Sequence, residues 1–342
     1  MDIDAALEVL NGKRVLVTGS TGFVGSHMTR RLFAAGIKPV LLVRSTSNPD
    51  LISEYKAGGA EIVVGDVTDR DSVFEAAKGA EYIIHIAALF REAKHVDEYY
   101  YKVNVEGTRN VLDAAAENGV KRMVHCSTVG VHSHILNPPA DETEDYRPGD
   151  IYQETKCEGE KLARSYFNEG KVNGVVIRPA MIWGEGDDRM LKLYKGVSQR
   201  KFPVIGSGKT MTHWIYVHDL VNGFILAATN ENAIGQVYII AGETPTSIST
   251  LVETVAECAG VKKFPIRIPA WPIQILGDIV ETICIPFGIE PPIYRRRVDF
   301  FTKDRHFDTS KAQSELGFKP QNTFKQEVDN IYQWYKKEGW LD

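Results

Sequence analysis

The chain of 342 residues has few cysteines and no surplus of basic residues, and each shortage excludes a class of protein. Lys and Arg number 40 against 45 Asp and Glu, giving a formal charge of −5. A general nucleic-acid-binding protein carries a basic surplus, so we expect no nucleic-acid partner. The four cysteines are far apart and form no C-x-x-C pair, which argues against a disulfide framework or structural zinc and favours a reducing compartment. They are Cys126, Cys157, Cys258 and Cys284.

Long uninterrupted apolar runs are also absent. Residues 1–10 hold three acidic side chains and no basic one, which is unlike a secretory signal. The most apolar late stretch, 273–289, contains Asp278, Glu281 and Pro286, and is too short and too charged to span a bilayer. We therefore expect no stable membrane insertion and a cytoplasmic location.

What the chain does have is an apolar content of 43%, enough for a large core. In its first half, short apolar runs alternate with segments of helical spacing, a pattern typical of a parallel sheet covered by helices on both faces. After about residue 180 the pattern becomes less regular. Strands are expected at 14–18, 40–43, 62–64, 82–86, 123–126, 175–177, 214–217 and 237–241, and helices notably at 23–35, 99–118 and 152–168. The fold class predicted is α/β, a doubly wound parallel sheet with a smaller, mixed C-terminal lobe.

A glycine-rich turn follows the first expected strand: Thr18-Gly19-Ser20-Thr21-Gly22-Phe23-Val24-Gly25. Glycines at this spacing allow a sharp turn, let backbone N–H groups approach a pyrophosphate, and let the next helix pack close to the strand. The same three glycines could form a plain tight turn. Their place between a strand and a helix favours a dinucleotide-binding loop.

The second expected strand ends in Arg44, where NAD-binding proteins usually carry an acidic residue for the ribose. An arginine there can pair with the 2′-phosphate of NADP, so the sequence favours NADP over NAD. A solvated Arg44 that stacks on adenine is the alternative, and it is compatible with either cofactor.

Tyr152 and Lys156 form a Y-x-x-x-K pair, which lies on one face of a helix. A lysine beside a phenol can lower its pKa and make it a usable acid or base. In isolation the pair would be ordinary surface residues. However, Ser127 and Thr128 follow the fifth expected strand, and ligands bind at the carboxyl ends of such strands.

In order along the chain, these motifs resemble those of the extended short-chain dehydrogenase/reductases, the NAD-dependent epimerase/dehydratase superfamily. The resemblance covers nearly the whole chain. It also rests on Asp66-Val67, His85-Ile86-Ala87-Ala88, Asn104-Val105-Glu106-Gly107-Thr108, Ser127-Thr128-Val129, Arg178-Pro179, the stretch 214–220 and the stretch 307–318.

The resemblance implies a role for each matching residue. The glycines should cradle the pyrophosphate, Asp66 and Val67 should meet the adenine, and Lys156 should bond the nicotinamide ribose. The cofactor-binding residues implied are Gly19, Thr21, Gly22, Phe23, Val24, Gly25, Arg44, Asp66, Val67, Ala87, Ala88, Ser127, Tyr152, Lys156, Pro179 and Ile182. Thr128, Tyr152 and Lys156 should be catalytic. His132 and His134 lack the further ligands that a metal site needs, so no metal is expected.

The resemblance also implies a Rossmann core of 11–182 plus 214–241, and a substrate-binding lobe of 183–213 plus 242–342. The helices 99–118 and 152–168 match those through which the family dimerises, so a homodimer is implied.

The substrate is a small molecule whose class stays open between two alternatives. Members acting on nucleotide sugars usually carry an arginine where this chain has Thr212, although Lys209 and Arg295-Arg296-Arg297 could hold a diphosphate or form a solvated basic face. The C-terminal part resembles 3β-hydroxysteroid dehydrogenase-like proteins. There, Ile273, Leu276, Val280 and Ile283 recur at helical spacing, to pack on a core, line an apolar pocket or touch a membrane surface.

We therefore expect an NAD(P)-dependent oxidoreductase that transfers hydride at a secondary alcohol or ketone. A nucleotide-sugar epimerase or dehydratase with tightly bound NAD is the alternative. A non-catalytic dinucleotide sensor is disfavoured, because a sensor needs the glycine loop but not Thr128, Tyr152 and Lys156.

Overall fold

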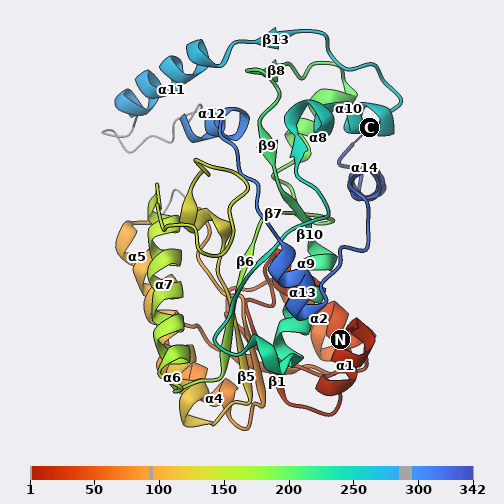
Figure 1. Ribbon diagram of the computed structural model, residues 1–342. Coiled ribbons are helices and arrows are strands. Elements are labelled where there is room, and N and C mark those ends of the chain that lie inside the picture. Colours follow the sequence, from red (N-terminus) through yellow and green to blue (C-terminus); the bar gives the residue numbers. More distant parts are fainter. Residues whose placement is uncertain (1, 92–94, 285–294, 342) are drawn as a thin grey trace.

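The centre of the molecule is a seven-stranded sheet in which every neighbouring pair of strands is parallel. A computed structural model describes residues 2–91, 95–284 and 295–341, without the side chains of 278, 281, 283, 284 and 295–298 (Figure 1). The strand order is β11-β6-β5-β4-β1-β2-β3, which confirms the predicted doubly wound fold. The strands are β1 (Val15–Thr18), β2 (Val40–Val43), β3 (Glu61–Val64), β4 (Tyr82–His85), β5 (Arg122–Cys126), β6 (Gly174–Pro179) and β11 (Val237–Ile240).

Two layers of helices cover the sheet, one on each face (Figure 1). Successive strand residues bury alternate faces: Val15 and Val17 join the core beneath α1, α2 and α9, whereas Leu16 joins the core beneath α4, α6 and α7. Because both faces are buried, the inner strands are apolar throughout. The helices are α1 (Ile3–Leu10), α2 (Phe23–Ala34), α3 (Pro49–Ala57), α4 (Arg70–Ala77), α5 (Asp97–Tyr101), α6 (Gly107–Glu117), α7 (Ile151–Asn168), α9 (Val217–Thr229) and α13 (Ser310–Leu316).

The single helix expected at 99–118 is instead three segments. α5 ends at Tyr101, a π-helical turn spans Lys102–Glu106, and α6 follows. The widened turn carries the buried Asn104, whose side chain bonds the backbone of Leu89 and the hydroxyl of Thr155. Such turns insert one residue into a helix and often lie beside functional sites. Here the turn connects the chain after β4 to helix α7.

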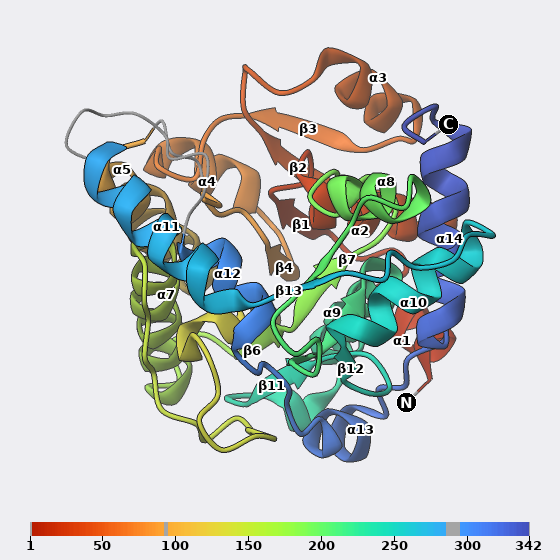
Figure 2. The same cartoon turned by 90° about the horizontal axis from the view of Figure 1, so that it is seen from above.

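A smaller lobe lies above the carboxyl ends of the strands (Figures 1 and 2). Its three two-stranded sheets pair β10 with β7, β12 with β9 and β13 with β8. The strand expected at 214–217 is therefore β10 of the lobe, whereas that expected at 237–241 is β11 at the edge of the main sheet. The lobe elements are β7 (Met181–Trp183), α8 (Leu191–Ser198), β8 (Val204–Ile205), β9 (Met211–Thr212), β10 (Trp214–Tyr216), β12 (Thr246–Ser247), α10 (Ile248–Cys258), β13 (Arg267–Ile268), α11 (Ala270–Cys284), α12 (Arg295–Thr302) and α14 (Phe324–Lys337).

The core of the lobe contains one buried carboxyl group. The Trp183 indole N–H donates to a carboxyl oxygen of Glu327 on α14 over 2.9 Å, and the indole ring stacks on the ring of Trp214. Burial, with the nearby charge of Asp219, raises the pKa of Glu327 to about 8. Glu327 is thus neutral at pH 7, which spares the lobe an unpaired buried charge.

The raised pKa of Glu327 predicts a pH-dependent stability. Its value of about 8 lies above the ordinary 4.5, so the stabilisation is complete below pH 4.5 and is lost as the pH rises through 8. Between pH 4.5 and 8, this group should lower the free energy of unfolding by at most about 1.4 kcal/mol per pH unit. Glu327→Gln keeps an acceptor for Trp183 and should remove this contribution, so that the free energy of unfolding falls less steeply with pH. Urea titrations from pH 4.5 to 9 would measure it. The exposed Glu338→Gln is the control, and a Glu327→Gln profile that matches the wild type would contradict the assignment.

Candidate active site

One cavity of about 1610 Å³ lies between the carboxyl ends of the strands and the lobe. The crevice at this edge of an open α/β sheet is the usual place for a ligand. The structure brings every residue implied to be catalytic or cofactor-binding to this one cavity. They are Gly19, Thr21, Gly22, Phe23, Val24, Gly25, Arg44, Asp66, Val67, Ala87, Ala88, Ser127, Thr128, Tyr152, Lys156, Pro179 and Ile182.

Two glycines of the loop, Gly19 and Gly25, have no room for a Cβ, so the backbone there packs closely. Gly19 has φ +75°, and a Cβ there would lie 2.7 Å from the backbone nitrogen of Ala87. A Cβ on Gly25 would lie 2.0 Å from the carbonyl oxygen of Gly19. The loop therefore closes directly onto the first turn of α2, where free N–H groups and the helix dipole favour an anion.

Beyond the glycine loop, two charged residues lie in the cavity at the ends of neighbouring strands. Arg44 directly follows β2, and Asp66 follows β3. Arg44 is exposed, and the hydroxyls of Thr21 and Ser47 lie near this strand end, 3.3 Å from each other. Asp66 accepts the backbone N–H of Thr68 over 2.9 Å. An adenosine placed here would meet a cation beside its ribose and a carboxylate beside its base.

Lys156 anchors helix α7 to the end of β5. Its buried ammonium donates to the carbonyl oxygen of Cys126 over 2.6 Å. Burial lowers the pKa of Lys156, although the nearby Glu160 acts in the opposite direction. The amine therefore occupies a fixed position one helical turn from Tyr152.

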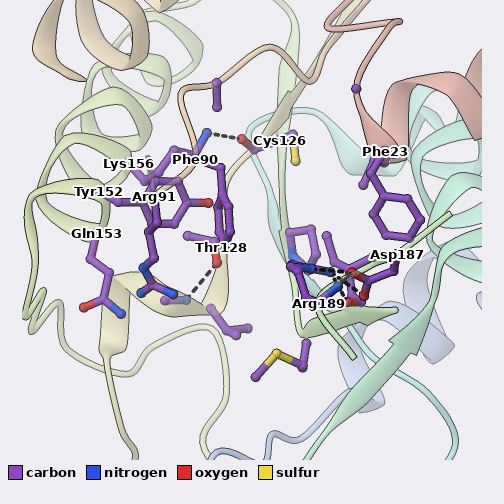
Figure 3. A pocket seen from close by; sticks show the side chains of 18 of the residues that line it. Phe23, Phe90, Arg91, Cys126, Thr128, Tyr152, Gln153, Lys156, Asp187 and Arg189 are labelled. Carbon is purple, nitrogen blue, oxygen red and sulfur yellow. Dashed lines mark hydrogen bonds and ion pairs between the residues drawn. The ribbon is translucent and has the colours of Figure 1, made fainter. Parts of the chain in front are cut away.

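Tyr152 points into the cavity between Phe90 and Arg91 (Figure 3). Its ring meets Phe90 edge-to-face at 5.0 Å, and the Arg91 guanidinium lies 5.2 Å from the ring centre. We expected Lys156 to lower the pKa of this phenol. The structure differs: burial raises the pKa of Tyr152, and the positive charges of Arg91 and Arg189 reduce that effect without cancelling it. The phenol is therefore protonated at neutral pH.

The hydroxyl of Thr128 faces the cavity, whereas that of Ser127 points toward Glu160. Thr128 caps the 3₁₀ turn Val129–His132, where its hydroxyl oxygen accepts the N–H of Gly130 over 3.0 Å, and it faces the cavity near Tyr152 (Figure 3). Ser127 donates to Glu160 over 2.5 Å, away from the cavity. Its contact with a cofactor would therefore come from its backbone.

A buried ion pair beneath the site was not anticipated. The Arg178 guanidinium on β6 donates to Glu160 on α7, with a shortest distance of 2.6 Å. Tyr146 donates to the same carboxylate over 2.6 Å. Burial alone would raise the pKa of Glu160, but the hydrogen bonds and charge of Arg178 lower it. The only feature of the sequence that could have indicated this ion pair is spacing. Glu160 lies one helical turn after Lys156, and Arg178 directly precedes Pro179.

The half of the cavity nearest the lobe combines an apolar, aromatic wall with charged side chains, among them Lys192, Lys303 and Arg305. Trp214 and Phe307 fall in the motif stretches 214–220 and 307–318, but no motif indicated the other wall residues, because they come from separate strands, helices and loops. Arg189 lies there, paired with Asp187 over 2.7 Å and bonded to the carbonyl of Ile182 (Figure 3). The apolar wall consists of Phe90, Met181, Met190, Leu193, Phe202, Trp214, Phe300, Phe301 and Phe307.

The cations suggested for a diphosphate do not gather in the described site. Lys209 does not line the cavity, and the side chains of Arg295-Arg296-Arg297 lie outside the described residues. Thr212 does line it, and its buried hydroxyl has no hydrogen-bond partner among the described residues. Within the same described part, no three His, Cys, Asp or Glu side chains form a group that could hold a metal ion.

Comparison with known proteins establishes the family. The model of the NAD dependent epimerase/dehydratase family matches residues 15–241. A 3 beta-hydroxysteroid dehydrogenase/Delta 5-->4-isomerase of Mycobacterium tuberculosis is 32% identical, over 97% of this chain and 92% of its own. The chain therefore belongs to the NAD-dependent epimerase/dehydratase family and is an NAD(P)-dependent enzyme, which confirms the resemblance seen in its motifs.

Other relatives differ in the reaction that their names describe. A 4-hydroxy-2-methyl-3-oxo-4-farnesyl-3,4-dihydroquinoline-1-oxide ketoreductase of Stigmatella aurantiaca is 29% identical, over 94% of this chain and 96% of its own. An N-acetyl-alpha-D-glucosaminyl-diphospho-ditrans,octacis-undecaprenol 4-epimerase of Escherichia coli O157:H7 is also 29% identical, over 94% of both chains. The family thus includes both net redox enzymes and epimerases.

Solved structures share the fold over almost the whole chain. The crystal structure of gox2253 aligns with a TM-score of 0.80 at 30% identity, covering 97% of this chain and 100% of that one. DesIV, a dTDP-glucose 4,6-dehydratase from Streptomyces venezuelae with NAD and TYD bound, aligns at 0.75 with 22% identity, covering 96% and 99%. At that identity the second match shows the fold alone.

Alanine substitutions at two glycines with the same φ distinguish the cost of backbone strain from the cost of a steric clash. Gly19 and Gly36 both have φ +75°, but a Cβ on Gly36 meets nothing within 4 Å. Gly36→Ala should lower the free energy of unfolding by about 1 kcal/mol and leave dinucleotide binding intact. Gly19→Ala should lower the free energy of unfolding by more than this and abolish dinucleotide binding, because the backbone of Ala87 must move to make room for the Cβ. Urea unfolding and dinucleotide titration would measure both, and equal effects of the two variants would refute the cradle.

Proposed function

We propose that this protein is an NAD(P)-dependent dehydrogenase or reductase that acts on a secondary alcohol or ketone in an apolar molecule. The observation that carries the proposal is the position of the Tyr152 phenol. It faces the boundary between the glycine-loop half of the cavity and the aromatic half. A substrate oxygen at that boundary would meet an acid–base group, while its carbon skeleton would lie against Phe300, Phe301 and Trp214.

The cavity fits a nicotinamide dinucleotide along the predicted residues. The glycine loop and the start of α2 would hold the pyrophosphate, Asp66 and Val67 the adenine, and Lys156 the nicotinamide ribose. Pro179 and Ile182 would border the nicotinamide. When bound, the cofactor supplies or accepts the hydride.

Tyr152 then supplies the proton. Because its pKa is raised, the phenol is protonated at neutral pH and can donate to the oxygen of a ketone as that oxygen gains charge. Thr128 offers a hydroxyl to the same oxygen, and Lys156 holds α7 in register with the end of β5. In the reverse direction, Tyr152 accepts the proton of the alcohol.

The substrate assignment rests on the composition of the wall and on the relatives. Thr212 stands where nucleotide-sugar enzymes usually carry arginine, and the aromatic rings of Phe202, Phe300 and Phe301 form the apolar wall on the lobe side of the cavity. Arg189, Lys192, Lys303 and Arg305 also line that side, so the assignment rests on the aromatic wall and on Thr212. A relative named as a 3 beta-hydroxysteroid dehydrogenase covers 97% of the chain. The epimerase relative supports the second candidate, an epimerase that keeps its NAD.

We further propose that the Rossmann core comprises 11–182 with 214–241. The packing of α9 and β11 with the main sheet supports this division, whereas β7 and β10, which lie at its boundaries, pair with each other in the lobe. The lobe comprises 183–213 with 242–342. The enzyme is a cytoplasmic homodimer that pairs through the region of α5, α6 and α7. In support, Val96 and Tyr101 are exposed there, at 70% and 42%.

Cofactor consumption distinguishes a reductase from an epimerase. With a panel of hydroxysteroids, apolar ketones and nucleotide sugars, we expect net NAD(P)H oxidation with an apolar ketone, whereas an epimerase leaves the cofactor unchanged overall. Tyr152→Phe should lower turnover by about 10²- to 10⁴-fold and leave cofactor binding nearly unchanged. Tyr332→Phe, on α14 and outside the cavity, is the matched control. Near-normal turnover in Tyr152→Phe, or conversion of a nucleotide sugar without net redox, would overturn the proposal.

Arg44 leads to a separate prediction about cofactor choice. If its guanidinium pairs with a 2′-phosphate, Arg44→Ser should weaken NADPH binding by about tenfold, since a charge-assisted hydrogen bond contributes about 1.5–3 kcal/mol. NADH binding should change little. Arg70→Ser, an exposed arginine outside the cavity, is the control. An equal loss for both cofactors would show that Arg44 only stacks on the adenine.

A further inference from the structure

Helix α11 presents an apolar surface to solvent. Trp271, Ile275, Leu276 and Ile279 are exposed at 66%, 52%, 47% and 51%, and Ile266, just before the helix, at 52%. These five residues, the α11 face, occupy only 14 positions of the chain. Trp271, Ile275 and Ile279 are four apart and so form one line along the helix. Single exposed apolar residues are normal in a folded protein, but a contiguous set indicates an interaction surface.

The rest of the described fold leaves this face uncovered. Seen from above, α11 lies on the near side of the lobe, beside α12 (Figure 2). Of the apolar stripe noted in the sequence, Ile273 and Val280 are partly buried, Leu276 belongs to the exposed face, and the side chain of Ile283 lies outside the described residues. The helix therefore has apolar residues both toward the lobe and toward solvent, more than packing on the lobe requires.

The sequence that includes α11 has a net charge of the opposite sign to that of the whole chain. Residues 262–297 contain six Lys or Arg and three Asp or Glu, whereas the whole chain carries −5. Lys262 and Arg267 are exposed immediately before the helix. Two copies of such a surface would repel each other, whereas an anionic surface would attract it. Trp271 at the start of the helix is a residue type that anchors proteins at the boundary of water and lipid.

We propose that the α11 face binds peripherally to the surface of a bilayer containing anionic lipids. The apolar side chains enter the boundary between headgroups and acyl chains, while Lys262 and Arg267 meet the lipid phosphates. Among the helices of the described residues, none combines the length and apolarity needed to cross a membrane. The helix therefore lies along the surface. The contact does not depend on which reaction the cavity catalyses.

Flotation of the full chain with vesicles tests the proposal. The protein should float with vesicles of phosphatidylcholine mixed with phosphatidylglycerol, more weakly with phosphatidylcholine alone, and less at high salt. Ile275→Ser with Ile279→Ser should lower the partition coefficient by at least about tenfold. The matched control is Leu136→Ser with Ile234→Ser, which removes two apolar residues exposed elsewhere, at 60% and 38%. Lys262→Ser and Arg267→Ser should each cost about fivefold on the anionic vesicles only.

Thermal melting of every variant checks the fold independently of activity. The proposal is overturned if the wild type does not float with either vesicle, or if the α11 variant floats as well as the control. It is also overturned if the α11 variant instead reduces the molar mass measured by light scattering without lipid, because the face then binds a second copy of the chain.

Discussion

The buried ion pair between Glu160 and Arg178 is the interaction on which the geometry of the site depends. It joins α7 to β6, and through Ser127 it also fixes the end of β5. Each of these three elements supplies part of the site: Tyr152 and Lys156 from α7, Thr128 after β5, and Pro179 from β6. Breaking such a pair leaves a charge without a partner inside the protein, which typically costs about 3–5 kcal/mol. The pair therefore positions groups that it does not itself touch.

The cavity combines two surfaces with different physical requirements. The half next to the sheet needs close backbone approach and N–H groups, so it is built from glycines at strand ends. The half next to the lobe needs apolar area, so it is built from aromatic side chains on short strands, loops and helix α12. The lobe is held together by its own core, in which Trp183 stacks on Trp214 and bonds a neutral Glu327. A rigid cofactor half can thus be combined with lobes of different composition, as expected where relatives of one family catalyse different reactions.

The motif that contains Tyr152 predicts the position of its side chain but not the direction of its pKa shift. The Y-x-x-x-K spacing correctly places two residues on one face of α7, because this depends only on the helical period. It led us to expect a lowered pKa for the phenol, and the structure shows a raised one. The reason is that the Tyr152 ring packs against Phe90 after β4 and loses hydration, which raises the pKa, whereas Lys156 is bonded to the carbonyl of Cys126. The sign of a pKa shift depends on neighbours that are distant in sequence.

Much of the fold and of the cofactor half could be predicted from the sequence because their signals are local. An apolar run such as Val15–Thr18 is a strand buried on both faces, and a glycine where φ is positive marks a turn that other residues would strain. The six strands expected in the first half lie within two residues of those observed. The π-helical turn at Asn104 was not predictable, because it serves contacts with Leu89 and Thr155, far away in the chain.

The sequence by itself therefore determined the sheet, the dinucleotide loop and the acid–base pair, since each depends on spacing within a few residues. Only the tertiary structure decided what surrounds them. It assembled the aromatic wall from segments far apart in the chain, paired Glu160 with Arg178, packed the phenol of Tyr152 against Phe90, and left the apolar residues of α11 in solvent. Each of these is a property of packing, and packing depends on which distant residues the fold brings together.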